Sequence, residues 1–160
     1  MTIRYAVPDD LGEIASAEAA CFPKEKAATK DQIRDRLAHW SDHFWLLFED
    51  GRLVSFIDGM ATDEADLTDD MYADASLHRA DGSWQMLFGV GTLPGLRGRG
   101  YAGLLMERVS EDSRRRGRKG IVLTCLQGMV PFYERFGFVS EGISGSSHGG
   151  VPWVQMRKLL

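Results

Sequence analysis

The stretch TLPGLRGRGYAGLL, residues 92–105, is the feature that most constrains this chain. Its glycines stand where a loop leads into a segment with helical apolar spacing. Such a loop leaves backbone N–H groups unpaired at the positive end of the helix dipole. Glycine lets the backbone approach a ligand closely, and Arg97 and Arg99 add positive charge. The sequence therefore predicts an anion site that suits a pyrophosphate.

Read from Gly98, the loop spells G-x-G-x-x-G, the dinucleotide-binding pattern. That fold needs a strand that runs directly into the turn, and an acidic residue about 20 positions later to bind the ribose. Here residues 93–96 separate the expected strand from Gly98, and the later window holds Arg118, Lys119 and the apolar run GIVLTC instead of an acid. No Lys-Ser/Thr pair follows the glycines, so a P-loop is also excluded.

Read from Arg97, the same loop spells R-x-x-G-x-A, with Gly100 and Ala102 at the fixed positions. Many acetyltransferases use this pattern to bind coenzyme A. On the loop alone, a glycine-rich turn with solvated arginines fits equally well.

Apolar periodicity and turn residues predict a mixed α/β chain. Asp50-Gly51 favours a type I′ turn between two apolar strands, whereas the acidic residues 63–74 suggest an irregular surface excursion. The expected helices are 8–21, one from about 29 to 37, 101–116 and 129–137, and the expected strands are 2–7, 43–50, 51–59, 84–93, 120–126, 138–144 and 151–159.

Length and composition indicate one domain over residues 1–160, with a core that needs no disulfides. The net charge of −4 argues against nucleic acid as a partner. Two separated cysteines predict neither a disulfide framework nor a zinc site, and no metal is expected at His39 and His43 because Ser41-Asp42 should end the helix between them. We expect a cytoplasmic protein, away from membranes, as a monomer or homodimer.

Four further segments carry a resemblance: EDGRLVSFIDG, DEADLT followed by LHRADGS, LRGRGYAG and GMVPFYERFGF. With them the chain resembles the GNAT superfamily of acetyl-CoA-dependent N-acetyltransferases, and within it the arylalkylamine (serotonin) N-acetyltransferases. The resemblance implies an α+β (mixed α/β) GNAT fold with one central twisted mixed sheet, flanked by about four helices. Acetyl-CoA would lie where the strands 84–93 and 120–126 splay apart.

The resemblance also implies site residues. Tyr133 would protonate the departing thiolate, although it could instead pack as one aromatic residue among Phe132, Phe136 and Phe138. Pantetheine amides would pair with the backbone of Val90, Gly91 and Thr92, an arrangement that an unpaired strand edge can provide. The pyrophosphate would lie on Arg97, Gly98, Arg99, Gly100, Tyr101, Ala102 and Gly103.

One departure concerns the general base. The arylalkylamine enzymes carry an H-x-H pair where this chain has Met86 and Phe88. The ammonium proton must then leave through another group, by way of water, or the amine must arrive already neutral. If the amine arrives neutral, kcat/KM should rise with pH as the neutral fraction of the amine rises. Three side chains could lie near the site and take part in removing this proton: His78, Glu64 and Gln127.

The expected acceptor is a small-molecule primary amine, with arylalkylamines, polyamines, aminoglycosides and protein N-termini all open. Phe22 and Pro23 match the region that encloses the aromatic substrate in the subfamily, and Met86 and Phe88 could line the same pocket; ordinary core packing explains each of them as well. The alternative function is a non-catalytic acyl-CoA-binding module that has lost its base.

Overall fold

The computed structural model describes residues 1–146 and 150–160. Its helices and strands confirm the mixed α/β class. They divide into two compact units. The first unit comprises Met1–Gly59 and Gly89–Val109, and the second comprises Met60–Phe88 and Ser110–Leu160.

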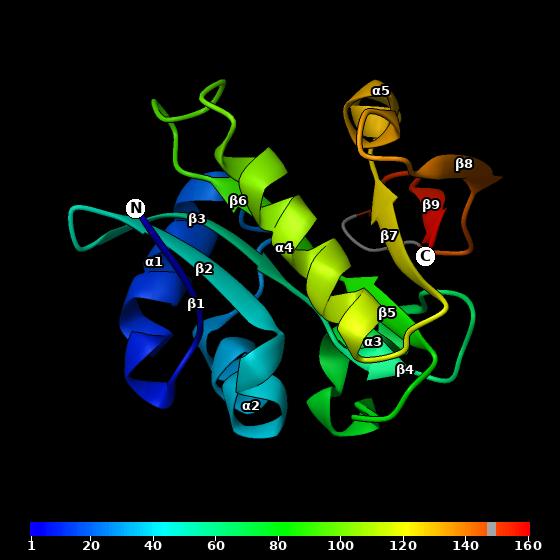
Figure 1. Ribbon diagram of the computed structural model, residues 1–160, viewed down its shortest axis with the longest axis horizontal. Helices are drawn as coiled ribbons and strands as arrows, with labels where there is room; N and C mark the ends of the chain where they lie inside the picture. The colour runs from blue at the N-terminus through cyan, green and yellow to red at the C-terminus, as the bar shows by residue number, and fades with distance from the viewer. Residues whose placement is uncertain (147–149) are drawn as a thin grey trace. The chain divides into compact units, whose positions relative to one another are not determined.

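The first unit is built on an antiparallel sheet with strand order β1-β2-β3-β6 (Figure 1). Helix α1 packs against α2 and against β3 and β6. Because α1 covers two neighbouring strands, its inward side chains lie beneath the edge of this sheet. The elements are β1 Thr2–Tyr5, α1 Leu11–Cys21, α2 Lys30–Trp40, β2 Phe44–Glu49, β3 Arg52–Asp58 and β6 Gly89–Thr92.

Local sequence signals explain this unit well. Asp50 and Gly51 both have positive φ, 52° and 76°, which confirms the expected type I′ turn between β2 and β3. The Thr29 side chain accepts the N–H of Gln32, and the Gln32 side chain accepts the N–H of Thr29. This capping box fixes the start of α2 where the sequence predicts it.

The second unit contains a mixed sheet with strand order β4-β5-β7-β9-β8, in which only the β5–β7 pair is parallel among the described strands. Strand β7 continues through Thr124 and Cys125, beyond its last partner on β5, and there pairs with β9 alone. The elements are β4 Ala61–Thr62, α3 Asp69–Ala73, β5 Trp84–Leu87, β7 Gly120–Cys125, α5 Val130–Glu134, β8 Val139–Ile143 and β9 Val154–Leu159. Helix α4, Tyr101–Arg115, begins in the first unit and ends in the second.

Two expectations about these elements were wrong. The segment 84–93 is not one strand, because it breaks at Phe88: β5 pairs with β7, whereas β6 pairs with β3. The described strands are accordingly hydrogen-bonded in two sets, β1-β2-β3-β6 and β4-β5-β7-β9-β8. The acidic stretch 63–74 is also less irregular than expected, since it contains α3 and buries Leu67 and Met71.

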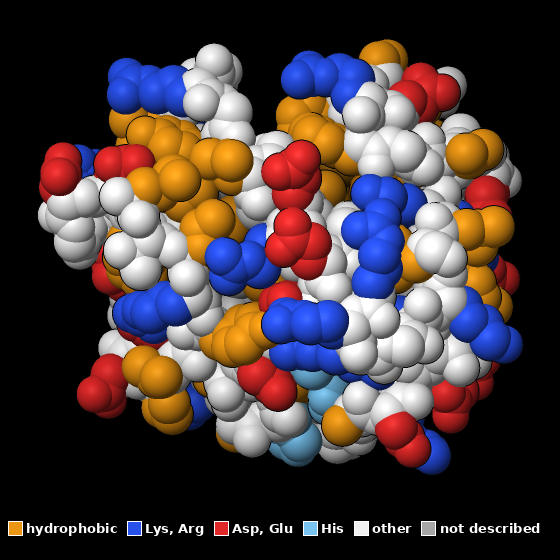
Figure 2. All heavy atoms as spheres, viewed as in Figure 1, with side chains coloured by type: hydrophobic (Ala, Val, Ile, Leu, Met, Phe, Trp, Pro, Cys, Tyr) orange, Lys and Arg blue, Asp and Glu red, His pale blue; other side chains and the backbone are white. Residues whose placement is uncertain are grey.

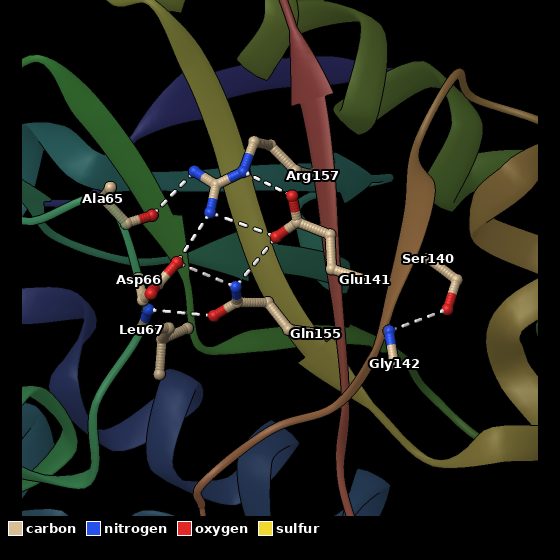
Figure 3. A network of polar contacts seen from close by, with 8 residues as sticks. All are labelled: Ala65, Asp66, Leu67, Ser140, Glu141, Gly142, Gln155 and Arg157. Carbon is tan, nitrogen blue, oxygen red and sulfur yellow. Dashed lines mark hydrogen bonds and ion pairs between the residues drawn. The ribbon is translucent and has the colours of Figure 1, made fainter.

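A polar network holds part of that acidic stretch against β8 and β9 (Figure 3). The Arg157 guanidinium pairs with Glu141 at 2.9 Å and with Asp66 at 2.7 Å, and it donates to the carbonyl of Ala65 at 2.6 Å. Gln155 accepts the N–H of Leu67 and donates to both carboxylates. The chain that leads into α3 is thereby tied at three successive residues.

Candidate active site

Strand β6 is the edge of its sheet, since the described strands pair with it only through β3. Its register runs from Asp58 opposite Gly89 to Ser55 opposite Thr92. Backbone groups of an edge strand that face away from its neighbour can bind an extended ligand by adding a strand. Val90, Gly91 and Thr92 therefore lie on an element of the kind that pantetheine amides require.

The loop after β6 has the geometry of an anion cradle. Gly95, Gly98 and Gly100 are exposed and have φ of +84°, +80° and +84°, a region that favours glycine. The carbonyl of Gly100 accepts the N–H of Leu104 at 3.1 Å, so α4 begins immediately after it. The first N–H groups of α4, at Tyr101, Ala102 and Gly103, consequently have no acceptor within the helix.

Both arginines of this loop are exposed. Arg97 donates from Nε to the carbonyl of Thr92 at 3.1 Å, which ties the loop back to the end of β6. Its guanidinium also lies beside the Cys21 thiol, where it partly offsets the rise in the pKa of that thiol caused by burial. The loop therefore combines free backbone donors with positive charge.

Packing beneath β6 explains its two glycines. A Cβ at Gly91 would lie 2.8 Å from ring carbons of Phe56, and a Cβ at Gly89 would lie 2.7 Å from Oδ1 of Asp58. The Phe56 ring also meets the half-buried Phe22 edge-on, with centroids 6.2 Å apart. Phe22 is thus connected to β6 through one aromatic ring, whereas the neighbouring Pro23 is exposed and begins a turn.

A buried cluster of three charged side chains, Glu18, Arg36 and Asp58, lies at the start of β6. Asp58 accepts the N–H of Gly89 at 3.1 Å through Oδ1 and pairs with Arg36 at 3.2 Å through Oδ2. Glu18 accepts the N–H of Ala28 at 3.2 Å through Oε2. Its other oxygen, Oε1, lies 3.5 Å from the position of a Cβ at Gly89.

This cluster holds two acidic side chains and one basic side chain, and burial makes it costly to ionise both acids. Burial, and then the neighbouring Asp58 carboxylate, raise the pKa of Glu18 to about 8 against the smaller opposing effects of the Ala28 N–H and Arg36. Burial also raises the pKa of Asp58, against the opposing effect of Arg36 and the Gly89 N–H. Our sequence reasoning missed the cluster, although Glu18 shares the inward face of α1 with Ile14 and Ala17.

Tyr133 lies on α5 in the second unit and is 7% exposed. Its ring packs edge-on against Phe132 and Phe138, with centroids 5.0 Å and 6.0 Å away. Burial raises the pKa of the Tyr133 phenol above its ordinary value, and the nearby Cys125 and Tyr72 raise it further. The phenol therefore keeps its proton at neutral pH, although the same rise makes it a weaker acid than an ordinary tyrosine.

Tyr72, on α3, is a residue that the sequence did not single out. Its hydroxyl lies 3.0 Å from Oγ1 of Thr124 on β7, and its ring packs on Phe88 with centroids 4.6 Å apart. Phe88 is half-buried, whereas Met86 is fully buried. The second unit thus brings Tyr72, Phe88, Thr124 and Tyr133 to one region, where Tyr72 is electrostatically coupled to Tyr133.

The residues considered as a base from sequence occupy other kinds of position. His78 is half-buried and accepts the N–H of Ala61 at 3.0 Å through Nδ1, which is a structural role. Glu64 and Gln127 are exposed. Within residues 1–146 and 150–160, no group of three His, Cys, Asp or Glu side chains could hold a metal ion.

The visible surface carries mixed charge. Figure 2 shows Lys and Arg side chains intermixed with Asp and Glu over the face in view. A nucleic-acid-binding domain typically concentrates basic residues on one face, so this side does not have that pattern. Among the described residues, no helix has both the length and the apolar character needed to span a membrane.

The raised pKa of Glu18 predicts how stability depends on pH. The native state keeps the Glu18 proton up to a pH of about 8, whereas the unfolded chain releases it near 4.5. The stability linked to this proton is therefore complete at low pH and is lost as the pH rises through 8. Because Gln does not titrate, Glu18→Gln should raise the melting temperature over wild type by several degrees at pH 9 and by little at pH 5.

Differential scanning calorimetry of both proteins from pH 5 to 9 measures this difference. Glu25→Gln, at an exposed position, should show no pH-dependent gap from wild type. A constant gap for Glu18→Gln across the range would mean that Glu18 does not hold a proton in the native state near neutral pH.

The proteins similar in sequence to this chain include two serotonin N-acetyltransferases. The hamster (Mesocricetus auratus) serotonin N-acetyltransferase is 32% identical over 162 aligned residues, covering 96% of this chain and 75% of that enzyme. The human (Homo sapiens) serotonin N-acetyltransferase is 31% identical, over 79% of this chain and 60% of that enzyme. This chain thus spans only part of the length of either relative.

One solved structure shares the fold of this chain, and one family model matches most of its length. The GphF GNAT-like decarboxylase in complex with isobutyryl-CoA superposes with a TM-score of 0.86 at 20% identity, over 99% of both chains, which shows a shared fold. The acetyltransferase (GNAT) family model matches residues 11–138. The chain therefore belongs to the acetyltransferase (GNAT) family.

Proposed function

We propose that this protein transfers the acetyl group of acetyl-CoA to a primary amine of a small molecule, with arylalkylamines as the first acceptor class to test. The observation that carries the proposal is the edge strand β6 followed by the exposed glycine loop at the start of α4. Family membership and the two serotonin N-acetyltransferase relatives support this chemistry. The family match runs through both compact units, which supports one acetyltransferase domain over residues 1–160.

In this proposal the first unit binds the coenzyme. The pantetheine amides pair with the open backbone edge of Val90, Gly91 and Thr92. The pyrophosphate accepts the unpaired N–H groups at the start of α4 and the charge of the two exposed arginines. The residues that surround the pyrophosphate are Arg97, Gly98, Arg99, Gly100, Tyr101, Ala102 and Gly103.

The reaction is a direct attack. A neutral amine adds to the thioester carbonyl, the C–N bond forms, and the tetrahedral oxyanion then collapses with cleavage of the C–S bond. Holding both reactants together supplies much of the rate. The leaving thiolate needs a proton, and Tyr133 is the proposed donor because its buried phenol stays protonated.

The acceptor is proposed to lie against aromatic side chains. In the first unit, Phe22 is a half-buried ring that an arylalkyl group could contact. In the second unit, Phe88 is also half-buried and packs on Tyr72. Pro23 and the fully buried Met86 would shape the surroundings. An arylalkylamine matches such a lining, because a flat apolar ring and a single ammonium leave little polar surface to satisfy.

An acetylation assay over a panel of amines tests the function directly. Free-thiol release in the presence of acetyl-CoA should be fastest with arylalkylamines and slower with polyamines, aminoglycosides and peptides that present a free N-terminus. A protein that binds acetyl-CoA but acetylates none of them would be the non-catalytic acyl-CoA-binding module instead.

Gly100→Asp tests the coenzyme site. Acetyl-CoA should raise the melting temperature of the wild type by mass action, and NAD should not. An aspartate here places a carboxylate against the phosphates, so the shift with acetyl-CoA should vanish. Gly142→Asp is the matched control, because both glycines are exposed, have φ of +84° and have open space around a Cβ. An acetyl-CoA shift that persists in folded Gly100→Asp protein would contradict the site.

Tyr133→Phe tests the proton donor. The change keeps the ring packing with Phe132 and Phe138 and removes only the hydroxyl. Steady-state kinetics should show kcat lowered by roughly 10- to 10⁴-fold, with coenzyme affinity nearly unchanged. Tyr5→Phe removes an exposed phenol from β1 and should leave kcat intact. Wild-type kcat in Tyr133→Phe would assign Tyr133 to packing alone.

A further inference from the structure

Acetyl transfer to an alkylamine requires that the ammonium group first lose a proton, because only the neutral amine has a free electron pair. Met86 and Phe88, which precede β6 in the chain, cannot accept a proton. We propose that Glu18 accepts this proton, held beside the first residue of the coenzyme strand by the packing around the Arg36–Asp58 ion pair. The inference rests on the proposed acetyltransferase function.

The position of Glu18 carries the inference. It lies on the face of α1 that packs on β6, and Oε1 is 3.5 Å from the place of a Cβ at Gly89. Oε2 accepts a hydrogen bond from the N–H of Ala28. No hydrogen bond in the described part of the chain reaches Oε1, so this oxygen can accept a proton.

The same end of α1 borders the proposed acceptor region. The N–H of Phe22 bonds to the carbonyl of Glu18 at 3.1 Å, so the two residues are one turn apart. Phe22 packs edge-on against Phe56, whose ring fills the space over Gly91. Glu18, on α1, thus lies one helical turn before Phe22, the ring against which we place the acceptor.

The charged and titratable groups near Glu18, together with those next to them, come from four parts of the chain. Cys21 lies on α1 itself, Arg36 on α2, Asp58 on β3, and Arg97 on the loop after β6 beside Cys21. Arg36 is paired with Asp58 and only partly offsets the rise in the pKa of Glu18; in the described part of the chain no ion pair joins Glu18 to a cation. An arriving ammonium would stabilise the ionised form of Glu18, so the cluster favours a cationic acceptor.

This environment makes Glu18 a better base. A carboxylate with the ordinary pKa of 4.5 is disfavoured by a factor of about 10⁶ in taking a proton from an alkylammonium of pKa about 10.4. With the pKa of Glu18 raised to about 8, that factor falls to roughly 250. The cost is that only about a tenth of Glu18 is ionised at pH 7.

Each proton that leaves the amine has a defined acceptor. The ammonium gives one proton to the Glu18 carboxylate, which later releases it to water. The neutral nitrogen attacks the thioester carbon. As the C–S bond breaks, the nitrogen loses its second proton to water, and the thiolate gains one from Tyr133, which takes a proton back from water. The products are the amide, the free thiol and one released proton.

The test uses pH profiles of Glu18→Gln and wild type. With an alkylamine, wild-type kcat/KM should rise to an inflection near pH 8 and level off, whereas Glu18→Gln should keep rising to the pKa of the amine itself. Near pH 8 the variant should be slower by roughly 10²-fold. With a weakly basic arylamine, which is already neutral, the two proteins should agree within about 3-fold. Glu25→Gln should match wild type with both amines.

The outcomes separate the inference from the function. Wild-type acetylation of either amine, with identical profiles for Glu18→Gln and wild type, would overturn the role of Glu18 and leave the acetyltransferase standing. If wild type acetylates no amine, the proposed function fails. Should Glu18→Gln not fold, the wild-type alkylamine profile decides alone: an inflection at the pKa of the amine, without one near pH 8, refutes the inference.

Discussion

One buried carboxylate organises the first unit. Asp58 ends β3 and is 2% exposed, yet it receives the N–H of Gly89 and the guanidinium of Arg36. A charge in that position is tolerable only with such partners, and losing either one typically costs several kcal/mol. Because the Gly89 N–H is directed to Asp58, the chain leaves β5 at Phe88 and continues as β6 beside β3. The edge strand that the proposed coenzyme site requires therefore depends on this carboxylate.

The same carboxylate has a consequence for the helices. Arg36 reaches Asp58 from α2, and Glu18 lies next to both from α1, so three elements converge on the first residue of β6. One guanidinium cannot neutralise two buried carboxyl groups, and the excess is resolved by keeping a proton on Glu18 near neutral pH. The packing of the sheet edge and the basicity of Glu18 thus have one electrostatic origin.

Much of this fold follows from short-range signals. The start of α2 near Thr29, the Asp50-Gly51 turn and the glycine loop before α4 depend on neighbouring residues, and each was predicted correctly. The break at Phe88 was not, because an apolar strand keeps the same alternation when it changes partners. The Glu18–Asp58 contact joins residues 40 positions apart, and no periodicity encodes such a pairing. The Arg157 network is missed for the same reason.

Stability alone does not account for a carboxylic acid at position 18. Glutamine has the same shape, would still accept the N–H of Ala28 and would remove a buried titratable group, so it should satisfy the packing at lower cost. Locally unfavourable residues of this kind tend to mark places where chemistry sets the requirement. Here the unfavourable group is next to the strand on which we place the thioester, and it titrates in the range where an amine must be deprotonated. The burial of Glu18, which is unfavourable for stability, would then supply the base that the reaction needs.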